Sequence, residues 1–378
     1  MRVLIVYPRI YVYGGAELLL VRLCNYLSQK GVENTLLTTS IIPEVEREFK
    51  GTDILIEKRE TSKGLMESIK FPVFLCKSVK KYINDFDLIN VHNYPSEFSA
   101  FASNKPVVWM CNEPELYLIT QLPDLSFRLR LFFRLLFSFE RFVVKNYMKR
   151  VVVADRFNAD RFKRLYGITP DIIHYGIDYE FFGQGEPEKA RDRFGLSDDF
   201  VVVHVSMLNP FKNQIESIKT AQQLRDKIPH IKLLLVGWGE ERDRAPLENY
   251  VRDNNLKENV LFVGHLNKED LRDLFHACDV VLHPIKSQGG WLSPFEALCA
   301  GKPIVVSEEM TASDIVKKEN LGIVTSNYAG AVLDVYQNPN KYKEMAEWRA
   351  KWVKGNLSWD RFGEDMLKVF NRALMSKG

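Results

Sequence analysis

Short apolar runs rich in β-branched residues alternate along this chain with longer amphipathic stretches. The runs lie at 3–6, 35–39, 88–91, 106–110 and 151–154 in the first half, and at 201–205, 232–236, 260–263, 280–283 and 303–306 in the second. Continuous apolar runs predict strands that are buried on both faces, and the amphipathic stretches predict the helices that cover them. The pattern therefore predicts an α/β protein with parallel sheets.

A Gly/Pro-containing segment at 181–187 interrupts this pattern, and the alternation starts again after it. We expect two Rossmann-like, doubly wound domains, over 1–182 and 183–356, with a cleft between them, because ligands of such sheets bind beyond the carboxyl ends of the strands. Residues 357–378 have the apolar spacing of an amphipathic helix, which we expect to pack back on the first domain.

Composition excludes several other classes of protein. The 52 basic and 49 acidic residues nearly balance, so charge gives no reason to expect nucleic-acid binding. The 5 cysteines are scattered without a CxxC pair, which argues against a disulfide framework and a zinc site. The apolar run after Met1 is too short for a signal peptide, and no uncharged apolar stretch of about 18 residues occurs. We predict a cytoplasmic protein that has no metal site and no membrane span.

Three loops that follow predicted strands carry the candidate functional residues. Gly14 and Gly15 open a helix, where backbone N–H groups can approach an anion. Lys212 follows the strand at 201–205, and a glycine loop before Pro294 leads into a helix whose first turn we expect to contain Glu296. Each feature also has an ordinary interpretation: a strand–helix turn, a solvated lysine and a carboxylate at a helix start.

Taken together, these loops resemble the retaining glycosyltransferases of family 4, which have the GT-B fold. The resemblance rests on GGAE at 14–17, the lysine loop at 206–213 and EALCAGKP at 296–303. Weaker agreement at 175–181 and 263–280 extends it over nearly the whole chain.

The resemblance implies a hexosyltransferase that uses a UDP- or GDP-sugar and needs neither a metal nor another cofactor. It implies that Lys212 stabilises charge on the leaving diphosphate, that Glu296 binds the ribose hydroxyls and that His92 is an active-site histidine. The donor-binding residues that it implies are Gly14, Gly15, Lys212, Gln288, Gly289, Gly290, Trp291, Leu292 and Glu296.

This assignment of Lys212 agrees with the chemistry of sugar transfer. Negative charge grows on the departing diphosphate, and a fixed ammonium group stabilises it more in the transition state than in the ground state. Asp85-Phe86-Asp87 spells the DxD motif of the other large glycosyltransferase fold. It precedes a strand in a chain of different architecture, so we interpret these aspartates as surface residues.

The chain also departs from the family pattern. Met207 stands where an arginine is usual, Gln288 replaces a glutamate, and Trp291 replaces a glycine. Losing an Arg–phosphate pair removes a charge-assisted interaction. Two alternatives therefore stay open beside the transferase: a degenerate GT-B protein that binds a sugar nucleotide without turnover, and a sugar-nucleotide epimerase on the same fold.

The acceptor side is marked by a basic and aromatic stretch at 127–150, in which Glu140 is the one acidic residue. Such a helix suits an anionic membrane interface; the alternative is a buried helix pair of the first domain. We expect a glycan or lipid-linked acceptor, assembled at the cytoplasmic face of the membrane. Glu113, which follows a predicted strand, is a candidate for binding the acceptor.

Overall fold

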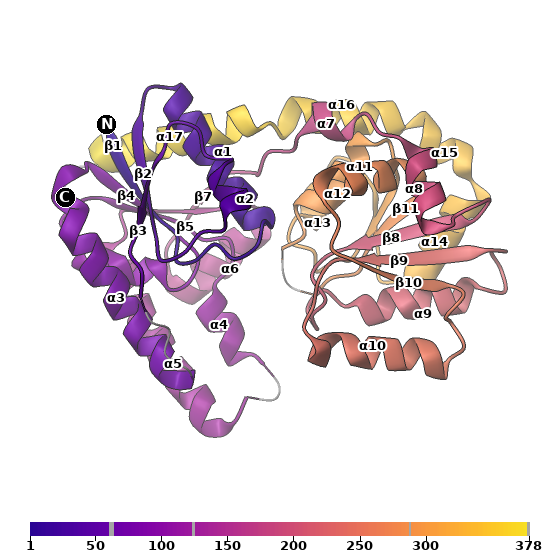
Figure 1. Ribbon diagram of the computed structural model, residues 1–378, viewed down its shortest axis with the longest axis horizontal. Helices are drawn as coiled ribbons and strands as arrows, with labels where there is room; N and C mark the ends of the chain where they lie inside the picture. Colours follow the sequence, from indigo (N-terminus) through magenta and orange to yellow (C-terminus); the bar gives the residue numbers. More distant parts are fainter. Residues whose placement is uncertain (60–63, 123–124, 287–288, 376–378) are drawn as a thin grey trace. The chain divides into compact units, whose positions relative to one another are not determined.

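The protein is described by a computed structural model that covers residues 1–59, 64–122, 125–286 and 289–375. The chain divides into two compact units (Figure 1). Unit 1 comprises Met1–Gly176 and Trp359–Gly378, and unit 2 comprises Ile177–Ser358. Each unit contains one parallel sheet, which confirms the predicted α/β fold with two Rossmann-like domains.

The sheet of unit 1 has the strand order β3-β2-β1-β4-β5-β6-β7. Its strands are β1 (Arg2–Val6), β2 (Glu33–Thr38), β3 (Asp53–Ile56), β4 (Leu88–His92), β5 (Val107–Met110), β6 (Arg150–Val153) and β7 (Asp171–Ile172). The edge strands β3 and β7 lie outside the predicted runs, because they are only four and two residues long and are partly exposed. β1 pairs with both β2 and β4, so the strand order reverses between β1 and β4.

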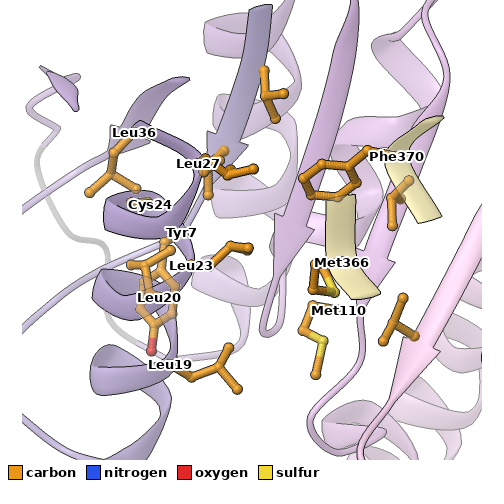
Figure 2. Close-up of a cluster of buried hydrophobic side chains, with 14 of the residues drawn as sticks. Tyr7, Leu19, Leu20, Leu23, Cys24, Leu27, Leu36, Met110, Met366 and Phe370 are labelled. Carbon is orange, nitrogen blue, oxygen red and sulfur yellow. The ribbon is translucent and has the colours of Figure 1, made fainter. Parts of the chain in front are cut away.

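Helices cover both faces of this sheet. They are α1 (Gly15–Gln29), α2 (Pro43–Glu46), η1 (Gly64–Met66), α3 (Glu67–Tyr82), η2 (Ile83–Asp85), η3 (Ser96–Ala102), α4 (Glu115–Thr120), α5 (Phe127–Tyr147), α6 (Arg156–Tyr166) and α17 (Trp359–Met375). Figure 2 shows one face of the core, where Met366 and Phe370 of α17 lie near Met110 of β5. A Cβ atom at Gly363 would lie 2.3 Å from the Tyr26 ring, so a glycine is needed where α17 approaches α1.

The sheet of unit 2 has the order β10-β9-β8-β11-β12-β13, and its order reverses between β8 and β11. Its strands are β8 (Phe200–Val205), β9 (Ile231–Val236), β10 (Val260–Gly264), β11 (Val280–His283), β12 (Ile304–Val306) and β13 (Ile323–Val324). Its helices are α7 (Tyr179–Phe182), α8 (Pro187–Phe194), α9 (Gln214–Leu224), α10 (Glu241–Asp253), α11 (Lys268–Ala277), α12 (Leu292–Cys299), α13 (Ser313–Lys318), α14 (Tyr328–Gln337), α15 (Pro339–Glu344) and α16 (Ala346–Asn356).

The first unit boundary differs from the position that the Gly/Pro segment suggests. The sequence places it after residue 182, whereas unit 2 begins at Ile177. The reason is packing: Phe182 is buried against Phe275 of α11, and Asp178 forms an ion pair with Lys268 at 2.9 Å. The segment before the Gly/Pro break is therefore part of the second core.

Within the described part of the chain, every helix is too short or too polar to cross a bilayer. The same residues contain no group of three or more His, Cys, Asp or Glu side chains arranged to hold a metal ion.

Candidate functional site

Unit 1 has a pocket of about 330 Å³ at the carboxyl ends of β1 and β4. Its polar lining includes Tyr7, Arg9, Glu17, Glu67, Asn93 and Glu115. Because the strand order reverses between β1 and β4, the loops after these strands diverge and leave a crevice, which is the usual ligand site of such sheets. We call it the unit 1 pocket.

A chain of hydrogen bonds holds one wall of the unit 1 pocket. The Tyr7 hydroxyl donates to Glu17 Oε1 at 2.6 Å and accepts from Asn93 Nδ2 at 2.9 Å. Asn112 Nδ2 donates to Asn93 Oδ1 at 2.8 Å. Burial and the Glu17 carboxylate raise the pKa of Tyr7, so its hydroxyl keeps its proton. Asn93 has a φ of 54°, a left-handed conformation that asparagine tolerates better than most residues.

Another part of the lining carries a carboxylate, Glu67, that is held by two guanidinium groups. Arg59 donates two hydrogen bonds to Glu67, at 2.8 and 2.9 Å, and Arg9 forms an ion pair with the same carboxylate. The guanidinium carbons of Arg9 and Arg59 lie 4.0 and 4.6 Å from the centre of the Phe71 ring. The two cations therefore share one carboxylate, which leaves the cluster with a net positive charge, and both pack on the Phe71 ring.

Glu115, the first residue of α4, completes the lining. Burial raises its pKa to about 7, although a hydrogen bond with the Tyr94 backbone opposes the shift. Glu140, on α5, lies deeper and accepts a hydrogen bond from the Tyr166 hydroxyl at 2.8 Å. Burial raises its pKa to about 8.

Two of the predicted residues of unit 1 lie away from the pocket. His92 is the last residue of β4 and is fully buried; its Nε2 lies 2.6 Å from Asn90 Oδ1, and burial lowers its pKa to about 3. The next residue, Asn93, lines the pocket instead. Glu113 accepts a hydrogen bond from Arg161 at 2.9 Å, while Glu115 faces the pocket. The active-site role of His92 and the acceptor role of Glu113 stay predictions, without support from this geometry.

Gly14 and Gly15 lie at the start of α1. Gly14 is the N-cap, and its N–H donates to Glu17 Oε2 at 3.1 Å. A Cβ atom at Gly14 would lie 3.1 Å from that oxygen. The glycine therefore leaves room for the Glu17 carboxylate, which accepts hydrogen bonds from both the Gly14 N–H and the Tyr7 hydroxyl.

In unit 2, Lys212 and the glycine loop come together at the carboxyl ends of β8 and β11. Lys212 Nζ donates to the Gly289 carbonyl at 3.2 Å. Asn209 Oδ1 accepts from the backbone N–H of Lys212 at 3.0 Å, and Asn213 Nδ2 donates to the Pro284 carbonyl at 2.7 Å. These bonds hold the loop after β8 to the segment after β11.

Gly290 has a φ of 155°, and a Cβ atom there would lie 2.5 Å from His283 Nε2. Sequence reasoning missed this histidine: both of its ring nitrogens are buried without a hydrogen-bond partner among the described residues, and burial lowers its pKa. The ring centres of His204 and His283 are 5.5 Å apart, on the neighbouring strands β8 and β11.

The remaining donor-side residues lie in or next to α12. Glu296 is buried, and this raises its pKa to about 8. The expectation that Glu296 lies in the first helical turn is wrong, because α12 begins at Leu292 and has no acidic residue in that turn. Trp291, the N-cap of α12, is buried and stacks on Phe295, so it packs the helix start. Met207 is 53% exposed, and Gln288 lies outside the described residues.

Two known families match the chain. Residues 13–181 match the family described as "Glycosyltransferase Family 4", and residues 186–352 match "Glycosyl transferases group 1". The two matches follow one another along the chain and meet near the boundary between the two units.

Curated relatives are glycosyltransferases by name. The chain is 26% identical over 239 residues to a D-inositol 3-phosphate glycosyltransferase of Mycobacteroides abscessus, with 60% of this chain and 52% of that protein aligned. It is 26% identical over 237 residues to a GDP-mannose-dependent alpha-(1-6)-phosphatidylinositol monomannoside mannosyltransferase of Mycolicibacterium smegmatis, with 58% and 62% aligned. The chain thus spans between half and two thirds of the length of these relatives.

Solved structures share the fold along the full length. The complex of Anabaena HepE with UDP-glucose has a TM-score of 0.80 at 18% identity and covers 98% of this chain and 100% of that one. WaaG, a glycosyltransferase involved in lipopolysaccharide biosynthesis, has a TM-score of 0.78 at 17% identity and covers 99% and 100%. At these identities the likeness concerns the fold alone. From the two family matches and the two parallel sheets, the chain belongs to the GT-B glycosyltransferases of family 4 and group 1, as a divergent member.

Proposed function

We propose that the protein is a hexosyltransferase that moves a sugar from a UDP- or GDP-linked donor to a glycan or lipid-linked acceptor, with retention of configuration and without a metal. Similar proteins support both the donor and the acceptor of this reaction. One relative is named for GDP-mannose and a phosphatidylinositol glycolipid, and HepE was crystallised with UDP-glucose. The observation that carries the proposal is the contact between Lys212 and the Gly289 loop where the strand order of unit 2 reverses.

The chemistry follows from the charge of this site. The Lys212 ammonium is held by a loop carbonyl, which is a weak partner compared with a diphosphate. An incoming donor would replace this carbonyl, and the ammonium would then stabilise the negative charge that grows on the leaving group. Glu296 is buried and follows the glycine loop in the sequence. We expect it to bind ribose hydroxyls, because a carboxyl group can do so in either protonation state.

A donor panel tests this function. We expect one family of nucleoside diphosphates, uridine or guanosine, to raise the melting temperature, because a ligand at 100 times its Kd adds about 2.7 kcal/mol of stability. With the matching sugar nucleotide and an acceptor, nucleotide release should follow. A chain that is stabilised by no nucleoside diphosphate would contradict the proposal.

A second candidate is a degenerate GT-B protein that binds a sugar nucleotide without turnover. The exposed Met207 favours it, since the side chain at this position offers no charge to a phosphate. Single-turnover mixing distinguishes the two functions: donor binding without nucleotide release, across a broad acceptor panel, would favour the degenerate protein.

We also propose that α5 contacts an anionic membrane surface, which would place the enzyme peripherally on the cytoplasmic face. Glu140 is buried against Tyr166, so it does not offset the cations on the outer face of α5. That face exposes Phe127 by 80% and Leu135 by 64%. The exposed residues Phe101, Phe139, Phe142 and Tyr147 form a contiguous aromatic cluster beside it.

This exposure argues against the alternative of a buried helix pair, because the fully buried residues of α5 are confined to Glu140, Val143 and Val144. Basic side chains with exposed aromatics are the combination that anionic interfaces attract. The proposal therefore fits a lipid-linked acceptor, which would be presented at that same surface.

A further inference from the structure

We propose that His283 is a positioning residue of unit 2, which holds the Gly289–Gly290 peptide in a turned orientation when a diphosphate binds Lys212. In that orientation the Gly289 carbonyl accepts a hydrogen bond from the His283 imidazole instead of from the Lys212 ammonium. This inference rests on the proposed transfer reaction, because the diphosphate belongs to its sugar donor. It goes beyond that reaction by assigning a role to a histidine and a change of orientation to one peptide of this chain.

His283, the last residue of β11, is a buried polar side chain whose ring makes no hydrogen bond within the described part of the chain. It is 2% exposed, and both Nδ1 and Nε2 lack a hydrogen-bond partner there. Buried polar groups are nearly always hydrogen-bonded, because a buried donor or acceptor that is left unpaired costs stability. An exception beside a candidate site is therefore expected where the partner arrives when the ligand binds.

His204, on the neighbouring strand β8, shows the usual situation of a buried histidine in this sheet. Its Nδ1 lies 2.8 Å from Ser217 Oγ, and its Nε2 lies 2.9 Å from Ser206 Oγ. The ring centres of His204 and His283 are 5.5 Å apart, and both side chains are buried. The unpaired nitrogens of His283 are therefore a feature of its own position, next to the glycine loop, and not of burial in this sheet.

The backbone of the glycine loop lies directly against this imidazole. A Cβ atom at Gly290 would lie 2.5 Å from His283 Nε2 and 2.5 Å from Ile285 Cδ1, so a side chain there would collide with both. The chain after His283 is held in place, since Asn213 Nδ2 donates to the Pro284 carbonyl at 2.7 Å. The histidine is therefore fixed, whereas two consecutive glycines give the loop the freedom to turn.

The peptide between Gly289 and Gly290 presents a carbonyl oxygen to Lys212. Lys212 Nζ donates to the Gly289 carbonyl at 3.2 Å. Because a trans peptide is planar, the Gly290 N–H points to the side opposite that carbonyl. A diphosphate that binds the ammonium would be repelled by the carbonyl oxygen, whereas a backbone N–H would attract it. Turning this single peptide exchanges the two groups, and the carbonyl then needs a hydrogen-bond donor on its new side.

The neutral imidazole of His283 can supply that hydrogen-bond donor. Burial, together with the nearby His204 and Lys212, lowers the pKa of His283 well below its usual value, so the ring stays neutral. A neutral imidazole carries one N–H and one acceptor nitrogen. With the N–H at Nε2, beside Gly290, the turned carbonyl gains a hydrogen bond and one ring nitrogen gains a partner. Lys212 thus holds the carbonyl before the diphosphate binds, and His283 holds it afterwards.

The direct test follows the histidine ring nitrogens of the full chain by heteronuclear NMR while uridine diphosphate or guanosine diphosphate is added. The signals of His283 are assigned by their loss in His283→Leu, and those of His204, whose nitrogens already have partners, are the internal control. We expect the diphosphate that binds to shift the Nε2 signal of His283 in the direction of hydrogen-bond donation, with a smaller change at His204. An unchanged His283 signal at saturation would overturn the inference. Equal shifts of the two rings would also overturn it, because they would report only the added charge of the ligand.

Two variants separate positioning from packing. His283→Leu replaces the unpaired nitrogens by apolar atoms, so the free protein should be at least as stable to heat as the wild type, while its affinity for the diphosphate falls by about tenfold. His283→Gln places an amide N–H near the position of Nε2 and should recover most of that affinity. The nucleoside monophosphate, which lacks the second phosphate, should bind all of these proteins alike. Equal diphosphate affinity of His283→Leu and the wild type would overturn the inference, as would a loss that His283→Gln does not recover.

The same titrations distinguish this inference from the proposed function. A wild type that binds a nucleoside diphosphate and leaves the His283 signals unchanged would overturn the positioning role and leave the transferase in place. A wild type that binds neither diphosphate would contradict the transferase and, with it, this inference.

Discussion

The two units use the same place in the same kind of sheet, yet they surround it with different charged groups. In unit 1, the crevice beyond β1 and β4 is lined by Glu17, Glu67 and Glu115 together with Arg9. In unit 2, the loops beyond β8 and β11 bring Lys212 to the backbone of a glycine loop, and the buried His204 and His283 lie on the strands that these loops follow. The comparison teaches that the sheet determines where a site forms, whereas the loop residues determine which charged groups line it.

The largest effect is expected at the cation of unit 2. Lys212→Met should reduce sugar transfer by about 10²–10³-fold, because it removes the charge that stabilises the leaving group. The measurement is the rate of nucleotide release under saturating donor. Lys219→Met is the control, since Lys219 lies on α9 and pairs with Glu216 at 2.9 Å. Equal rates in the two variants would show that the charge of unit 2 is not used in catalysis.

The next largest effect is expected in the glycine loop, at the residue that follows the Gly289 carbonyl contacted by Lys212. Gly290→Ala should destabilise the protein by about 2–3 kcal/mol, because the residue has a left-handed φ of 155° and an added Cβ would meet His283. Thermal unfolding measures the change. Gly355→Ala in α16 is the control, since a Cβ there would meet nothing within 4 Å, and it should be neutral or slightly stabilising. A neutral Gly290→Ala would mean that this loop is not constrained as described.

A smaller effect is expected at the outer face of unit 1. The double variant Arg134→Glu/Arg141→Glu should weaken binding to vesicles that contain phosphatidylglycerol by at least about 30-fold, since each basic residue near an anionic surface contributes about 1 kcal/mol and each added carboxylate is repelled. Flotation at low salt gives the bound fraction, with pure phosphatidylcholine vesicles as reference. Lys227→Glu in unit 2 should bind as the wild type does; if all three proteins float equally, α5 is not the contact.

A further expected effect is a change in the slope of stability against pH, again in unit 1. Burial raises the pKa of Glu140 from 4.5 to about 8, so the folded state keeps a proton that the unfolded state releases above pH 4.5. The contribution of this group to the free energy of unfolding is complete below pH 4.5. It declines as the pH rises towards 8, by at most about 1.4 kcal/mol per pH unit. Glu140→Gln should flatten the decline seen in urea unfolding between those pH values. An identical slope in the variant would place the titration elsewhere.

Much of the fold was predictable, because the signals that define it are local. The apolar runs at 3–6 and 201–205 correspond to β1 and β8. Phe362, Met366 and Phe370, which the periodic spacing places on one side of a helix, form part of the buried face of α17. The loops that carry Lys212 and Gly289 were also found, since each follows a strand.

The remainder of the candidate site depends on contacts between distant residues. Arg9 and Glu67 are 58 residues apart, and neither follows a pattern that predicts their ion pair. His92 and Asn93 are adjacent, and which of the two reaches the pocket depends on where β4 ends. The same holds for Glu113 and Glu115, whose directions are decided by the turn before α4 and by Arg161.

The central claim is that Lys212 binds the second phosphate of a nucleotide at the switch point of unit 2. Isothermal titration of Lys212→Met and wild type with a nucleoside diphosphate and with the corresponding monophosphate tests it directly. The account predicts that the variant loses at least about tenfold in affinity for the diphosphate, with little change for the monophosphate. An equal affinity of both proteins for the diphosphate would contradict it.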